Sequence, residues 1–109
     1  MRPGALAGFT LALILAACAE DSTAPGPGSG DPNRGRQVYL TQCTACHNPD
    51  PSKPGSLAPP VKGSSPVLLE ARLVRGMYPP GYKPKRESSV MQPMLHLAPA
   101  IPDLAAFLQ

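Results

Sequence analysis

Apolar residues at helical spacing mark the start of the chain's main folded region. A helix is predicted over 32–44, because Asp31 is a good cap and a proline follows it as the first helical residue. Gly35, Val38 and Tyr39 are three and four residues apart, so they share one face of this helix. That face is the candidate for burial against another helix.

Two further helical patterns follow. A helix is predicted over 66–75, where Ser65 is the cap, a proline starts the helix and a glycine stops it. The last helix is predicted over 104–108, opened by Pro99 or Pro102, with its leucines and phenylalanine forming an apolar face. No stretch shows the strict alternation of a half-buried strand, so the predicted class is all-α with long Pro-rich loops.

Residues 1–17 are typical of a secretory leader, with Arg2 as a short positive region before an apolar run over residues 5–17. The run is shorter than the ~20 residues of a membrane-spanning helix. Its end, Leu-Ala-Ala-Cys18, resembles the lipobox of bacterial lipoproteins, which implies cleavage before Cys18 and a diacylglycerol on its sulfur. The alternative is a plain secretory signal with Cys18 as a free thiol. Ala19 lacks the Asp that is linked with inner-membrane retention, which favours the outer membrane.

Composition separates a linker from a domain with a thin core. Residues 18–30 hold the lipidated Cys and a flexible linker rich in Pro and Gly, which leaves 31–109 as the domain. The chain has 16 Pro, 10 Gly and no Trp, so a cofactor is favoured over a purely protein core. The net charge of +3 is too weak for a nucleic-acid binder, and loss of the leader would remove Arg2 and leave nine basic against seven acidic residues.

The strongest chemical signal is Cys43-Thr-Ala-Cys46-His47. Cys-x-x-Cys-His is the pattern for covalent attachment of haem, because two thiols at this spacing can reach the two vinyl groups of one porphyrin while the histidine lies under the iron. One alternative is a thioredoxin-like redox pair, which lacks the surrounding βαβ pattern. The other is half of a zinc site with His47, which needs a fourth ligand.

From Asp31 to Gln109 the chain resembles class I cytochromes c. Gly35 and Tyr39 match the glycine and the aromatic residue that meet the last helix at a close crossing in that family, and the string at 104–108 is similar to its terminal helix. The resemblance implies a small cytochrome c fold, with helices packed around one covalently bound haem c. His47 would then be the proximal iron ligand.

The resemblance also places the second axial ligand on a loop shortly before the final helix. Met91 lies thirteen residues before Leu104 and is the preferred ligand, with Met94, ten residues before it, as the alternative. Met77 directly follows the middle helix and comes too early. His96 could give a bis-His haem, but we interpret it as a solvent-facing loop residue. Neither Met91 nor Met94 is followed directly by Pro, which departs from the commonest family pattern.

Two other segments are expected around the haem. Pro59 and Pro60 resemble the segment whose backbone carbonyl accepts the Nδ1–H of the proximal histidine, and the choice between them stays open. The loop 76–90 is rich in Tyr, Lys, Arg and Pro. It could cover the haem edge and bind the propionates, form a basic docking patch for an acidic partner, or simply be a solvated loop.

These patterns together predict a membrane-tethered one-electron carrier, not an enzyme, between redox proteins of a respiratory or oxidative pathway. We expect the protein to be exported, to face the periplasm and to meet partners with acidic docking surfaces. We expect no small-molecule substrate and no nucleic acid. The alternatives are a haem-based sensor or small haem enzyme with an open sixth site, and a structural lipoprotein without haem.

Overall fold

The computed structural model describes residues 3–4 and 30–109. The predicted leader 1–17, the lipid site Cys18 and most of the linker 18–30 lie outside the described residues, and those assignments stay predictions. Among the helices of the described part, none is long and apolar enough to span a bilayer.

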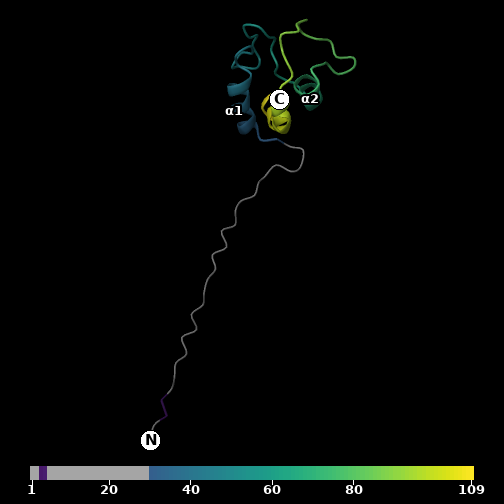
Figure 1. The fold of residues 1–109 in the computed structure, drawn as a ribbon. Coiled ribbons are helices and arrows are strands. Elements are labelled where there is room, and N and C mark those ends of the chain that lie inside the picture. The colour runs from purple at the N-terminus through teal and green to yellow at the C-terminus, as the bar shows by residue number, and fades with distance from the viewer. Residues whose placement is uncertain (1–2, 5–29) are drawn as a thin grey trace.

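The described part of the chain consists of helices and loops, without a strand, as the all-α prediction required. Three α-helices, α1 (Pro32–Gln42), α2 (Pro66–Leu73) and α3 (Ile101–Phe107), are joined by long loops, and a 3₁₀ helix, η1 (Leu95–Ala100), leads directly into α3. Figure 1 shows α3 lying between α1 and α2, and α3 contacts both of them. The sequence pattern missed η1, because a short 3₁₀ segment with an internal proline has no amphipathic periodicity.

Both predicted N-terminal caps are confirmed. The Asp31 carboxylate accepts the backbone N–H of Asn33 at 2.8 Å, and the Ser65 hydroxyl accepts that of Leu68 at 3.1 Å. The α-helices α1 and α2 each end two residues before the predicted position. For α3, Pro102 in the first turn is the opening proline, whereas Pro99 lies inside η1.

The main packing contact is the crossing of α1 and α3. A methyl group on Gly35 would overlap the backbone carbonyl of Asp103, so the two helix backbones are in direct contact there. One turn further along α1, the ring of Tyr39 packs against that of Phe107 with centroids 5.4 Å apart. Burial raises the pKa of Tyr39 to about 12, and its hydroxyl donates to the backbone carbonyl of Asn48. The expected close crossing at Gly35 and Tyr39 is therefore present.

Polar contacts and a small core reinforce the crossing. The Asp103 carboxylate accepts the backbone N–H of Asp31 at 2.8 Å and the Arg34 Nε–H at 3.2 Å, and these bonds lower the pKa of Asp103. The buried core is made of one tyrosine and five aliphatic side chains from all three α-helices and η1: Tyr39, Leu73, Leu97, Ile101, Leu104 and Leu108.

Replacement of Gly35 by Ala tests the crossing. The added methyl group meets backbone atoms that cannot rotate away, so α1 and α3 must separate, and we expect the free energy of unfolding to fall by about 3 kcal/mol. Guanidinium chloride unfolding measures the change, with Arg36→Ala at an exposed neighbouring position as the control. A Gly35→Ala variant as stable as Arg36→Ala would mean that the helices do not touch here.

Candidate functional site

A cavity of about 370 Å³ opens beside the core, within the range of about 300–1,000 Å³ that is usual for small-molecule sites. Leu73, Leu104 and Leu108 from the core form part of its wall, and most of its lining is apolar. The remainder comes from the end of α1 and the turn after it, from the loop 57–61 and Ser64, from side chains of α2 and from the segment 78–94.

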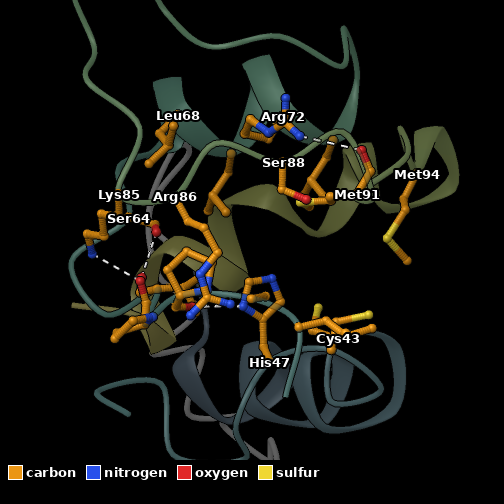
Figure 2. A pocket seen from close by; sticks show the side chains of 18 of the residues that line it. Cys43, His47, Ser64, Leu68, Arg72, Lys85, Arg86, Ser88, Met91 and Met94 are labelled. Atoms are coloured by element: carbon orange, nitrogen blue, oxygen red, sulfur yellow. Dashed lines mark hydrogen bonds between the residues drawn. The ribbon is translucent and has the colours of Figure 1, made fainter. Parts of the chain in front are cut away.

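His47 projects into this cavity from the turn that follows α1 (Figure 2). The turn is closed by a hydrogen bond from the backbone N–H of His47 to the Cys43 carbonyl at 2.9 Å. The ring Nδ1 lies 3.1 Å from the Pro59 carbonyl oxygen, and because a carbonyl can only accept, Nδ1 carries the proton in this contact. Burial lowers the pKa of His47 despite this hydrogen bond, so the ring is neutral at pH 7 and its Nε2 keeps a free lone pair.

The two candidate prolines therefore have different contacts. The Pro59 carbonyl faces His47, whereas the Pro60 carbonyl accepts a hydrogen bond from the Lys85 ammonium group at 3.0 Å. Both prolines line the cavity. Only Pro59 is in a position to orient the imidazole.

Gly55 is a residue of the site that the sequence analysis missed. A Cβ atom at Gly55 would overlap the carbonyl of Cys46, and the backbone N–H of Leu57 donates to that same carbonyl at 3.3 Å. The loop that carries Pro59 is therefore packed directly on the Cys-His turn. In the sequence, a glycine beside Pro54 suggests only a turn. Its close approach to the Cys46 carbonyl depends on how this loop packs on the Cys-His turn, which the tertiary structure decides.

Cys43 and Cys46 are both free thiols that line the cavity. Burial raises the pKa of Cys43 to about 11, so this thiol is protonated at neutral pH. Redox-active Cys-x-x-Cys pairs instead depend on a lowered pKa, which disfavours the thioredoxin-like alternative. Within residues 3–4 and 30–109, no three His, Cys, Asp or Glu side chains are grouped so as to hold a metal ion.

The four candidates for a second axial ligand separate into two groups. Met91 and Met94 line the cavity, and Figure 2 shows both across from His47. Met77 and His96 do not line it: the Met77 side chain is exposed, and His96 Nε2 lies 3.0 Å from Gln42 Oε1 on the surface.

The two remaining methionines are held differently. Met94 is half-buried against the core, and its backbone N–H donates to the Leu73 carbonyl at 2.7 Å. Met91 is 37% exposed, and its carbonyl lies 3.4 Å from the guanidinium of Arg72. Met94 therefore packs against the core, whereas Met91 is more exposed to solvent.

The loop 76–90 forms one side of the cavity and carries cationic groups to it. Tyr78, Tyr82, Lys85 and Arg86 all line the cavity. The rings of Tyr78 and Tyr82 are stacked, with centroids 5.4 Å apart and planes 9° from parallel. A ligand with an apolar body and an anionic edge would fit a cavity with these walls.

Comparison of the chain with protein-family models, with curated proteins and with solved structures returned no match. A functional assignment therefore depends on the residues of the cavity. Their chemistry combines a neutral imidazole, two free thiols and two thioethers around one apolar space.

Proposed function

We propose that residues 31–109 form a small c-type cytochrome domain that carries one covalent haem c and transfers single electrons. The observation that carries the proposal is the contact between His47 Nδ1 and the Pro59 carbonyl, beside Cys43 and Cys46 in one apolar cavity. A histidine that directly follows Cys-x-x-Cys and is oriented by a backbone carbonyl is arranged as an iron ligand.

The residues of the cavity fit a haem. Cys43 and Cys46 are unpaired and line the same wall as His47, as two thioether bonds to one porphyrin require. Leucines from the core provide an apolar surface for the macrocycle, and Lys85 and Arg86 are suited to its anionic propionates. The donor set of an imidazole and a thioether is one that low-spin haem iron accepts.

When bound, the haem would supply the one-electron couple between ferric and ferrous iron. His47 donates its Nδ1–H to Pro59, which fixes the ring plane and makes Nε2 a stronger electron donor. The apolar wall formed by Leu73, Leu104 and Leu108 excludes water and lowers the local dielectric constant. The thioether of Met91, with Met94 as the alternative, would favour the ferrous state. This assignment is of an electron carrier, not an enzyme.

The same proposal includes a membrane tether and redox partners. Cys18 would carry the lipid, with the domain exported, facing the periplasm and held at a bacterial membrane, the outer one being favoured. Arg72, Lys85 and Arg86 at the cavity lining carry three positive charges, and those that the propionates do not neutralise would give this side of the domain a positive potential. Proteins with acidic docking surfaces are the partners that such a potential would steer to the haem edge.

Removal of either thiol tests haem attachment. Cys43→Ala or Cys46→Ala should lose most of the holoprotein. The double variant should also lose its helix content, because the haem would form part of the apolar core on which the helices pack. Haem staining of a denaturing gel and far-ultraviolet circular dichroism measure the two effects, with Ser52→Ala as a control at an exposed position. A wild-type chain without haem stain would leave the structural lipoprotein as the better reading.

The second axial ligand is tested by three single variants of the holoprotein. Met91→Ala should remove the Met-to-iron charge-transfer band and lower the reduction potential by a few tenths of a volt, within the span of about 0.8 V that axial ligands control. Met94→Ala and His96→Ala should keep the band. Loss of the band in Met94→Ala alone would move the ligand to Met94, and a wild-type protein without the band would favour the sensor or enzyme with an open sixth site.

The tether is tested by Cys18→Ala. This change removes the sulfur to which the diacylglycerol would be attached, so incorporation of a labelled fatty acid should be lost, and the protein should be released or keep its leader. Metabolic labelling and fractionation of cells provide the measurement. Labelling of Cys18→Ala at the wild-type level would contradict the lipobox assignment.

A further inference from the structure

Arg72, on α2, contacts both the loop 76–90 and the segment that carries Met91. Its guanidinium carbon lies 4.4 Å from the centroid of the Tyr78 ring, and its Nη2 lies 3.4 Å from the Met91 carbonyl oxygen. The ring of Tyr78 also stacks on Tyr82. Figure 2 shows Arg72 extending from α2 toward Met91 at the edge of the cavity. One guanidinium therefore joins a helix, a loop and a candidate ligand segment.

The chemistry of these contacts depends on the planar guanidinium. A distance of 3.4 Å is long for a hydrogen bond, so the stack on Tyr78 is the stronger of the two contacts. A guanidinium can stack with its face and donate with its edge at the same time, which a lysine ammonium group cannot do. Burial of both aromatic rings is partial, and the interaction is accordingly modest in strength.

The loop is also tied at other points that limit its movement. Lys85 donates to the Pro60 carbonyl at 3.0 Å, next to the residue that orients His47. At the start of the loop, Gly76 has a φ of +65°, and a Cβ atom there would lie 2.8 Å from the ring of Pro93. The loop thus contacts the chain on both sides of the cavity. The Arg72 stack on Tyr78 links it to the Met91 side in addition to the contact of Gly76 with Pro93.

We propose that Arg72 is a positioning residue that holds the Met91 segment against the cavity by tying it to Tyr78 and the loop. This inference rests on the proposed function, with Met91 as the thioether ligand. Arg72 does not ligate iron; it raises the fraction of molecules in which Met91 is in place. Loss of the stack should increase the population in which Met91 has moved away.

Competition by added imidazole measures that population in the ferric holoprotein of the full chain. Imidazole binds only when Met91 has left, so its apparent affinity rises in proportion to the Met-off fraction. We expect Arg72→Ala and Tyr78→Leu each to tighten imidazole binding about fivefold, whereas Tyr78→Phe keeps the ring and stays near wild type. Arg72→Lys should behave like Arg72→Ala, because it keeps the charge and loses the planar stack.

Arg75→Ala is the matched control, since it removes an exposed positive charge just beyond the same helix. A double-mutant cycle of Arg72→Ala and Tyr78→Leu should be non-additive, because both changes break one contact. Tyr78→Leu carries the test if Arg72→Ala yields no holoprotein. As a second measurement, trypsin should cleave after Lys85 or Arg86 faster in both variants than in Arg75→Ala, because the loop is released.

The inference is overturned if Arg72→Ala and Tyr78→Leu bind imidazole no more tightly than Arg75→Ala, or if their effects are additive. In either case the Met-to-iron band of the wild type would remain, and the proposed carrier function would stand. A wild-type chain that binds no haem, or whose iron is ligated by a residue other than Met91, would overturn the inference together with the corresponding part of the proposed function.

Discussion

The contact between the backbones of α1 and α3 fixes the position of the cavity. Because Gly35 lets the two helices touch at Asp103, the next turn of α1 places Tyr39 against Phe107 and directs the end of the helix toward the core. The Cys-His turn follows at once, and its backbone hydrogen bond to Cys43 sets the direction of His47. A shift of the crossing would therefore move the imidazole as well as the helices.

The packing around this crossing leaves a cavity beside a small core. Six buried side chains form the core cluster, and three of its leucines also line the cavity. A ligand in that space would complete the apolar contacts of the helices, so cofactor binding and folding would be linked. Burial at the cavity raises the pKa of Cys43 and lowers the pKa of His47. Both side chains are therefore uncharged where they face the cavity.

Much of the helical framework could be predicted from local sequence. The caps at Asp31 and Ser65 depend on side chains that bond their own neighbours, and the face shared by Gly35 and Tyr39 depends only on helical spacing. The cluster of Cys43, Cys46 and His47 is also local, because these residues lie within five positions. The sequence therefore determined the presence of the three α-helices, the face of α1 that meets α3 and the grouping of Cys43, Cys46 and His47, since each depends on interactions between near neighbours in the chain.

The tertiary structure decided which of several similar residues face one another. Pro59 and Pro60 are equivalent by sequence, but only the loop packed on the Cys46 carbonyl brings Pro59 to His47 and Pro60 to Lys85. The same holds for the methionines: Met91 and Met94 reach the cavity, while Met77 does not. The stack of Arg72 on Tyr78 has no local signature either, because its ring comes from an irregular loop. Contacts of this kind depend on how loops without periodicity fold back, which the packing of the whole domain determines.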